Sequence, residues 1–318
     1  MRVLVTGGTG YLGAAIVRAL HQRGHHPVVF ARRASSAGLP GVPYDGDIRD
    51  RHALQAACRG VGAVIHSAAL VSLWRPDPRE FDAVNVGGLE NALDVARSAG
   101  VSRIVYTSSF LARPPAGEQR PLAANDYQRT KVAALDIARN AARGGLPVVI
   151  LFPGVVYGPG AETEGNLLGR MIRDHLRGKL PGLIGADRRW SYSYVDDVAA
   201  AHVEAAVRTG ASGEYAVGGE NVEQMRVFEI VRNLTGRALP RRMPFVVAET
   251  VGAFEEARMR WSSRPPLLTR GTVQIFRHEW PLDSARSIAE LNYVVTSLEN
   301  GVAAVCSGMG PFLAPASS

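Results

Sequence analysis

Residues 3–13 read VLVTGGTGYLG, a short β-branched run, a turn with three spaced glycines and the start of an amphipathic segment. Glycines at positions 7, 10 and 13 let the backbone turn tightly and approach a pyrophosphate, and the helix that follows presents free N–H groups at its N-terminus. Glycine triplets also occur in ordinary turns. Because this triplet directly follows a strand and opens a helix, it predicts a dinucleotide-binding site on an α/β fold.

The alternation of strand-like and helix-like segments continues through the first half of the chain. Short apolar runs predict buried parallel strands at Arg2–Thr6, Pro27–Ala31, Ala63–Ser67, Ser102–Thr107 and Pro147–Phe152. The segments between them predict helices at Tyr11–Arg23, His52–Ala57, Arg79–Ala99 and Asp126–Arg143. This order is typical of a Rossmann fold, a doubly wound parallel sheet with helices on both faces. We expect a dinucleotide-binding domain over residues 1–158, with sheet strands continuing from the second half, and a smaller C-terminal substrate-binding lobe over residues 159–318.

Composition narrows the choice of partners. The 318 residues carry a formal net charge of +7, but the basic residues are scattered, which favours small anionic ligands over nucleic acid. Cys58 and Cys306 are too few for a disulfide framework, and no metal-ligand spacing is present. Neither a signal peptide nor an apolar run of about 20 residues is visible. The sequence therefore predicts a cytoplasmic protein without a metal, membrane or nucleic-acid partner.

Tyr127 and Lys131 are the candidate catalytic pair. Four residues apart on a helix, they share one face, where a positive charge favours ionisation of a phenol. The tyrosine could then exchange a proton with a substrate hydroxyl or ketone. Such a pair also occurs by chance on surfaces. Here, however, only Lys131 and Lys179 among the 36 basic residues are lysines, which favours a chemical reason for the ammonium at position 131.

These motifs, in this order, resemble the extended short-chain dehydrogenase/reductase family, the NAD-dependent epimerase/dehydratase superfamily. The similarity covers nearly the whole chain and includes the segments 46–50, 66–69, 85–88, 195–198 and 218–221. Many nucleotide-sugar members carry an arginine and an asparagine where this chain has Phe152 and Val155. The chain therefore looks most similar to the dihydroflavonol-reductase and farnesol-dehydrogenase branch.

The resemblance implies a role for each motif residue. Tyr127 would be the acid/base, Lys131 would stabilise its anion, and Ser109, rather than Ser108, would bind the reacting oxygen. The residues that would contact the cofactor are Gly7, Gly10, Tyr11, Leu12, Gly13, Arg32, Arg33, Asp47, Ile48, Ser67, Ala68, Ala69, Asn85, Thr107, Tyr127, Lys131, Pro153, Gly154, Val155 and Val156.

The end of the second predicted strand bears on the choice of cofactor. Enzymes that select NAD usually place an acid there to bind the ribose 2′-hydroxyl. This chain has Arg32 and Arg33 instead, and no acid appears until Asp45. Since an arginine can pair with a 2′-phosphate, we expect NADP to be preferred, with NAD left open.

Bulky apolar residues near the strand ends predict an apolar substrate, with Leu70, Trp74, Phe110 and Tyr157 as its walls. The first hypothesis is hydride transfer between the nicotinamide and an alcohol or ketone. The alternatives are a nucleotide-sugar epimerase or dehydratase with a retained NAD, and a non-catalytic dinucleotide sensor. Family resemblance also implies a homodimer through the helices Arg79–Ala99 and Asp126–Arg143. Substrate identity, direction of reaction and pathway stay open.

Overall fold

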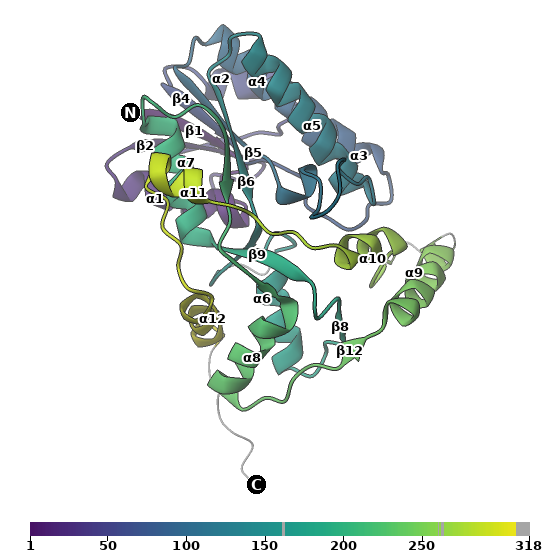
Figure 1. The fold of residues 1–318 in the computed structure, drawn as a ribbon. Helices are drawn as coiled ribbons and strands as arrows, with labels where there is room; N and C mark the ends of the chain where they lie inside the picture. Colours follow the sequence, from purple (N-terminus) through teal and green to yellow (C-terminus); the bar gives the residue numbers. More distant parts are fainter. Residues whose placement is uncertain (161–162, 260, 262–263, 310–318) are drawn as a thin grey trace.

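The computed structural model describes residues 1–160, 163–259, 261 and 264–309. At its centre is a seven-stranded parallel sheet in the order β10-β6-β5-β4-β1-β2-β3 (Figure 1). The order of strands reverses between β1 and β4, so the crevice for a ligand opens at their carboxyl ends. The strands are β1 (Arg2–Thr6), β2 (His26–Ala31), β3 (Val42–Asp45), β4 (Ala63–His66), β5 (Arg103–Thr107), β6 (Val148–Pro153) and β10 (Gly213–Val217).

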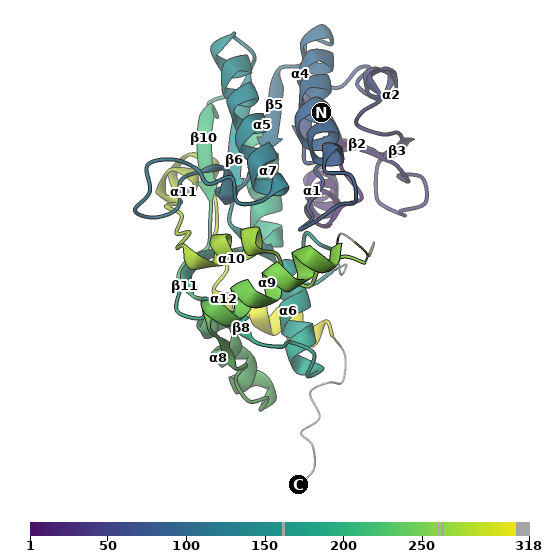
Figure 2. The ribbon, with the colours of Figure 1, turned by 90° about the vertical axis from the view of Figure 1, so that its right-hand side faces the viewer.

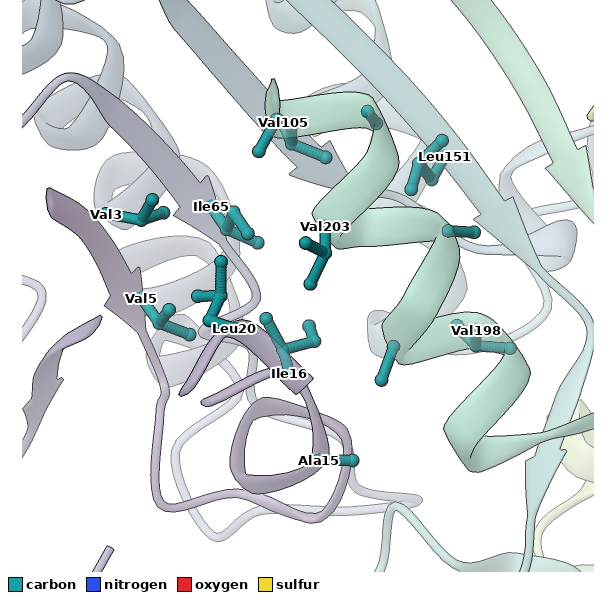
Figure 3. Close-up of a cluster of buried hydrophobic side chains, with 14 of the residues drawn as sticks. Val3, Val5, Ala15, Ile16, Leu20, Ile65, Val105, Leu151, Val198 and Val203 are labelled. Carbon is teal, nitrogen blue, oxygen red and sulfur yellow. The ribbon is translucent and has the colours of Figure 1, made fainter. Parts of the chain in front are cut away.

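Helices cover both faces of this sheet because alternate strand residues point to opposite sides. On one face, Ile16 and Leu20 of α1 (Tyr11–Gln22) and Val203 of α7 (Val195–Val207) pack in the cluster that holds Val3 and Val5 of β1 (Figure 3). The other face packs against three helices, α2 (Arg51–Ala57), α4 (Gly88–Ser98) and α5 (Asp126–Arg143). The predicted fold, a doubly wound Rossmann sheet, is confirmed.

The helix predicted over Arg79–Ala99 contains an irregularity. It begins as α3 (Arg79–Phe81), widens into a π-helical segment, η1 (Asp82–Gly87), and continues as α4. Such π-bulges are frequent at functional sites. This one holds the buried Asn85 beside α5.

Elements from the second half of the chain join two parts of the molecule, the large sheet and a smaller C-terminal lobe. α7, β10 and α11 (Ala285–Leu291) pack with the large sheet. The other elements build a smaller lobe around a separate apolar core, with two short sheets in the orders β11-β9-β7 and β12-β8 (Figure 2). These elements are β7 (Val155–Tyr157), β8 (Leu183–Ile184), β9 (Arg189–Tyr194), β11 (Glu220–Glu223), β12 (Arg242–Met243), α6 (Leu167–Leu176), α8 (Gln224–Thr235), α9 (Phe245–Met259), α10 (Arg270–Arg277) and α12 (Leu298–Ser307).

The cysteines, membrane-spanning helices and metal sites were considered above from composition alone, and each can be checked in the described residues. Cys58 and Cys306 are both free and buried. Across the described ranges, no helix is both long enough and apolar enough to cross a bilayer. In the same ranges, no three His, Cys, Asp or Glu side chains gather as a metal site would require.

Candidate active site

The glycine turn after β1 has the form of a phosphate cradle. Gly7 adopts a φ of +68°, and a Cβ there would lie 2.7 Å from the Ala68 Cα. A Cβ on Gly13 would collide with the Gly7 carbonyl oxygen. α1 begins after Gly10 with no capping side chain and no acid in its first turn. Its first N–H groups are therefore open to an anion, and the residues present fit a pyrophosphate.

Beside this turn, the ends of β1 and β4 are joined by buried hydrogen bonds. Thr6 Oγ1 and His66 Nδ1 are 3.0 Å apart, and Ser67 Oγ donates to the Thr6 carbonyl oxygen at 2.8 Å. Burial lowers the pKa of His66 to about 3, and the charge of Lys131 adds to that shift. His66 is therefore neutral, and its hydrogen bond with Thr6 holds the end of β4 against the end of β1.

At the outer end of the crevice, Arg32 and Arg33 are exposed, and neither guanidinium forms a hydrogen bond or ion pair with another described residue. Asp47 is already engaged, because Arg49 Nη2 donates to its Oδ2 at 2.7 Å and this hydrogen bond lowers the pKa of the carboxyl. Ile48 is buried against α4. The two arginines are thus the groups here that remain available to a ligand.

Tyr127 and Lys131 lie on the first two turns of α5. Asn125 caps that helix by accepting a hydrogen bond from the Gln128 backbone N–H at 2.9 Å. Lys131 is 3% exposed and donates from Nζ to the Thr107 carbonyl oxygen at 3.0 Å, which anchors α5 to the end of β5. Burial lowers the pKa of Lys131 to about 8, so its ammonium is largely charged at neutral pH.

The pKa of Tyr127 moves opposite to the sequence interpretation. Burial raises it to about 12, and only the side chain of Ser109 opposes that shift. Lys131 was expected to lower the pKa of Tyr127. Burial has the larger effect, because the charged phenolate loses more solvation by water than the surrounding groups replace. At neutral pH the free protein therefore holds Tyr127 as a protonated phenol.

Ser109 lies where β5 passes into the short 3₁₀ helix η2 (Phe110–Ala112). Its Oγ caps η2 by accepting a hydrogen bond from the Leu111 N–H at 3.2 Å. Its side chain also lowers the pKa of Tyr127 by hydrogen bonding, against the larger effect of burial. The neighbouring Ser108 is buried, and its side chain lowers the pKa of Tyr106 instead of that of Tyr127. Of the two serines, this placement favours Ser109 as the partner of Tyr127.

Asn85 links the loop after β4 to α5, the helix that carries Tyr127 and Lys131. Its Oδ1 accepts a hydrogen bond from the Leu70 N–H at 2.7 Å, and its Nδ2 donates to the Leu70 carbonyl oxygen and to Thr130 Oγ1. These three bonds are all made to protein atoms. In this arrangement Asn85 holds the site together, rather than offering a free group to a cofactor.

His202 is a site residue that the sequence did not single out. From α7, its Nε2 accepts a hydrogen bond from Thr107 Oγ1 at 2.9 Å, and its Nδ1 donates to the Val198 carbonyl oxygen at 2.7 Å. Burial lowers its pKa to about 4, which keeps the ring neutral for this pattern. No local motif marks it, because its partner Thr107 is 95 residues away in sequence.

The four predicted wall residues separate into two groups. Leu70 and Trp74 are half-buried in the loop after β4, and Phe110 packs between the rings of Trp190 and Trp280. Tyr157 is fully buried, and a Cβ on Gly301 of α12 would overlap its hydroxyl. Its expected place on an exposed substrate wall is therefore corrected, since it belongs to the core of the C-terminal lobe.

Beyond Pro153 the chain turns into that lobe. The Gly154 N–H donates to Ser193 Oγ at 3.1 Å, Val156 is half-buried, and Val155 borders a narrow cavity. The cavity is almost entirely apolar. Its walls are Val155, Leu167, Leu168, Met171, Trp190, Tyr192, Gln224, Phe228 and Phe276.

Gln224 is the one amide in this wall, and it lies in no motif that would have indicated it. Its Nε2 donates to two backbone carbonyl oxygens, those of Ile184 at 3.3 Å and Gly185 at 3.0 Å. These acceptors fix which end of the amide is nitrogen. Within the described part of the chain, Oε1 has no hydrogen-bond donor. The residues that line the cavity thus include one amide whose oxygen accepts no hydrogen bond from a described residue.

Comparison with known proteins decides the family. The profile of the NAD dependent epimerase/dehydratase family matches residues 3–218, which include the glycine turn, α5 and α7. The chain belongs to this family. Its description names NAD as the cofactor, and the predicted family resemblance is confirmed.

Similar proteins include reductases. Sterol demethylase protein B of Methylococcus capsulatus is 34% identical over 93% of this chain and 94% of the relative. A putative dihydroflavonol 4-reductase of Synechocystis is 29% identical, covering 94% of this chain and 92% of that protein. The 2-alkyl-3-oxoalkanoate reductase of Stenotrophomonas maltophilia is also 29% identical, covering 95% and 97%.

Solved structures of similar shape include epimerases. The crystal structure of gox2253 has a TM-score of 0.80 and 28% identity, covering 96% of this chain and 97% of that one. UDP-glucose 4-epimerase of Thermus thermophilus, in complex with NAD, has a TM-score of 0.74 and 27% identity, covering 98% and 99%. Reductases and epimerases are thus both similar to this chain, and the choice between reactions depends on its own residues.

Proposed function

We propose that this protein is an NAD(P)-dependent oxidoreductase that interconverts an apolar ketone and its alcohol. The observation that carries the proposal is that Tyr127, a protonated phenol at neutral pH, packs against the apolar core of the C-terminal lobe, and residues of that core line an almost wholly apolar cavity. A protonated phenol is the form that gives a proton to a carbonyl oxygen in reduction.

Each catalytic residue has one task in this scheme. Ser109 donates a hydrogen bond to the carbonyl oxygen, and Tyr127 transfers its proton to that oxygen in reduction and takes it back in oxidation. Lys131, one helical turn away, stabilises the phenolate with its ammonium. A bound nicotinamide supplies or accepts the hydride. The cradle of Gly7, Gly10 and Gly13 would hold its pyrophosphate.

The cavity supports the apolar substrate. Its aromatic and aliphatic walls favour an apolar group and offer no cation to a nucleotide diphosphate. Gln224 Oε1 would accept a hydrogen bond from a substrate hydroxyl. We therefore propose a substrate with a hydroxyl group distant from the reacting carbon. Relatives whose names refer to a sterol or to an alkyl-oxoalkanoate are in line with this class.

Arg32 and Arg33 support a preference for NADP. Both are exposed directly after β2, where a ribose 2′-phosphate would lie, and neither guanidinium is engaged by another described residue. An arginine in that position can form charge-assisted hydrogen bonds with the phosphate.

Epimerisation of a nucleotide sugar is the second candidate, since a UDP-glucose 4-epimerase has a similar shape along its full length. It would use the same Tyr127, Lys131 and Ser109. A kinetic comparison separates the two reactions. We expect bulky cyclic ketones to have kcat/KM values at least a hundredfold above any conversion of UDP-glucose. Saturable conversion of UDP-glucose, without turnover of the ketones, would reverse the order.

Assembly and location are part of the same proposal. We infer a homodimer through the α3–α4 and α5 helices, where small alanine side chains permit close approach, and a cytoplasmic location in which Cys58 and Cys306 stay reduced. Light scattering at micromolar concentration should give twice the chain mass of 34.0 kDa. A mass equal to one chain would refute the dimer.

A further inference from the structure

The buried ammonium of Lys131 depends on a backbone oxygen rather than on an opposite charge. Its Nζ donates to the Thr107 carbonyl oxygen at 3.0 Å. Within the described part of the chain, no carboxylate pairs with it, and burial lowers its pKa. A buried charge without a counter-charge relies on the hydrogen bonds that it makes. The position of the Thr107 carbonyl therefore decides how well the ammonium is held.

Thr107 lies at the end of β5, where the sheet holds its peptide on one side. The Ser108 N–H, in the same peptide, donates to the Leu151 carbonyl oxygen of β6 at 2.8 Å. The carbonyl of a trans peptide points the opposite way, toward β4. β4 pairs with β5 only up to Tyr106, so the carbonyl lies beyond the ladder, where Lys131 donates to it. Further control of this carbonyl has to come from the Thr107 side chain.

His202 of α7 holds that side chain. Its Nδ1 donates to the Val198 carbonyl oxygen at 2.7 Å, which leaves Nε2 as an acceptor for Thr107 Oγ1 at 2.9 Å. The imidazole is fully buried. Figure 3 shows Val198 and Val203 of the same helix on the sheet face that carries Val105 of β5. α5, with Lys131, packs on the other face, so Thr107 is held from both sides of the sheet.

We propose that His202 is a positioning residue for Lys131. By fixing the Thr107 hydroxyl on one face of the sheet, it keeps the carbonyl oxygen of the same residue aimed at the ammonium on the other face. The position and proton affinity of Lys131 are properties of the free protein. Only the consequence for catalysis rests on the proposed function.

The other titratable groups around Lys131 do not change charge near neutral pH. The Tyr106 ring centroid lies 5.3 Å from Nζ, and Tyr127 is one turn away on α5. Burial raises the pKa of both phenols, so both are protonated. His66 and His202 are buried and neutral, because burial lowers the pKa of each ring. Within this group, titration near neutral pH therefore reports on Lys131 itself.

Lysine NMR tests the proposal directly, because the chain contains only two lysines. Full-length protein labelled with ¹³C at lysine Cε should give one signal for buried Lys131 and one for exposed Lys179, the internal reference. His202→Leu and Thr107→Val should each lower the pKa of Lys131 by about 0.5–1, roughly a three- to tenfold loss of proton affinity, since the ammonium loses a well-placed acceptor. Thr107→Val keeps the shape of the side chain. His175→Leu, which removes a buried histidine of the C-terminal lobe, is the matched control and should leave the signal unchanged.

Conservative and double variants separate positioning from a general loss of structure. His202→Gln and Thr107→Ser each keep a polar group for the hydrogen bond, and Lys131 should titrate in them as in the wild type. If His202 acts through Thr107, the double variant should shift the pKa of Lys131 no further than either single variant. Shifts that add would mean that His202 acts on Lys131 directly, which would overturn the proposal. A pKa that neither Thr107→Val nor His202→Leu moves would overturn it as well.

Kinetics connect the positioning role to the proposed reaction. Because a lower pKa removes the ammonium at lower pH, the alkaline fall of kcat in His202→Leu should move to lower pH by the same amount. The KM for the ketone should stay within about twofold, since His202 lies away from the cavity walls. A wild type that turns over no ketone would refute the proposed function alone, because the NMR titration needs neither substrate nor cofactor.

Discussion

The carboxyl edge of the large sheet and the cavity of the C-terminal lobe treat polar groups in opposite ways. At the edge, Thr107 is hydrogen-bonded to His202, Asn85 to Thr130, and Lys131 to the Thr107 carbonyl oxygen, so the polar groups support each other. In the cavity, one oriented amide, Gln224, faces walls of aliphatic and aromatic side chains. Under the proposed function, the edge performs the reaction on any accepted substrate, whereas the lobe decides which substrate is accepted.

The largest expected effect comes from the edge. Tyr127→Phe should lower kcat by a factor on the order of 10²–10⁴, the usual contribution of a positioned proton donor. The loss should be similar for every accepted ketone, while cofactor affinity by fluorescence titration stays within a few-fold. Tyr215→Phe is the control, because that hydroxyl donates to Glu290 away from the site. Activity of Tyr127→Phe within a few-fold of the wild type would end the assignment.

A smaller effect is expected where the edge meets the adenosine. If one of Arg32 and Arg33 holds a 2′-phosphate, its replacement by alanine should cost the phosphorylated cofactor about 1.5–3 kcal/mol, roughly ten- to a hundredfold in kcat/KM. The unphosphorylated form should be unaffected, as should both cofactors in the exposed control Arg59→Ala. A wild-type preference for NAD that neither variant changes would contradict the proposal.

The lobe should respond to Gln224→Leu in a different manner. Losing one neutral hydrogen bond costs about 0.5–1.5 kcal/mol, so kcat/KM should fall roughly two- to tenfold for ketones with a distant hydroxyl. Ketones without that hydroxyl should react as well as before or better. Gln274→Leu, on the exposed side of α10, is the control. A uniform loss across both substrate groups would show that Gln224 supports the fold and does not select substrates.

His202 of α7 supports the sheet edge through Thr107, and pH tests this contact. Its pKa in the folded protein, about 4, is below the ordinary value of 6.5, so the unfolded chain takes up the proton first. The stabilisation is therefore complete above about pH 6.5 and is lost as pH falls toward 4, by about 1.4 kcal/mol for each tenfold difference in proton affinity between the folded and unfolded states. Urea unfolding at several pH values should show a shallower decline for His202→Gln than for the exposed control His52→Gln. Equal declines would remove His202 from this account.

The sequence predicted the sheet edge well because its signals are local. A glycine turn, a strand end and a one-turn Tyr127–Lys131 spacing each lie within a dozen residues, so periodicity and motif order were sufficient. The predicted direction of the Tyr127 pKa shift was wrong, because sequence spacing reveals a nearby charge but does not reveal burial.

The lobe was harder to predict because its parts come from distant segments. β7, β8, β11 and β12 are two to four residues long, too short to show a period. Tyr157 looked like a wall residue because it follows a strand end, but α12, far along the chain, covers it. Gln224 and His202 acquire their roles only through partners about 40 and 95 residues away.

Cofactor stoichiometry is the most direct test of net hydride transfer. A purified sample would be incubated with a bulky cyclic ketone and reduced cofactor, and both would be followed together. The account predicts one cofactor oxidised for each ketone reduced, by a protein that is purified without bound dinucleotide. Protein that retains a full equivalent of NAD and converts a nucleotide sugar with no net change in nicotinamide absorbance would contradict it.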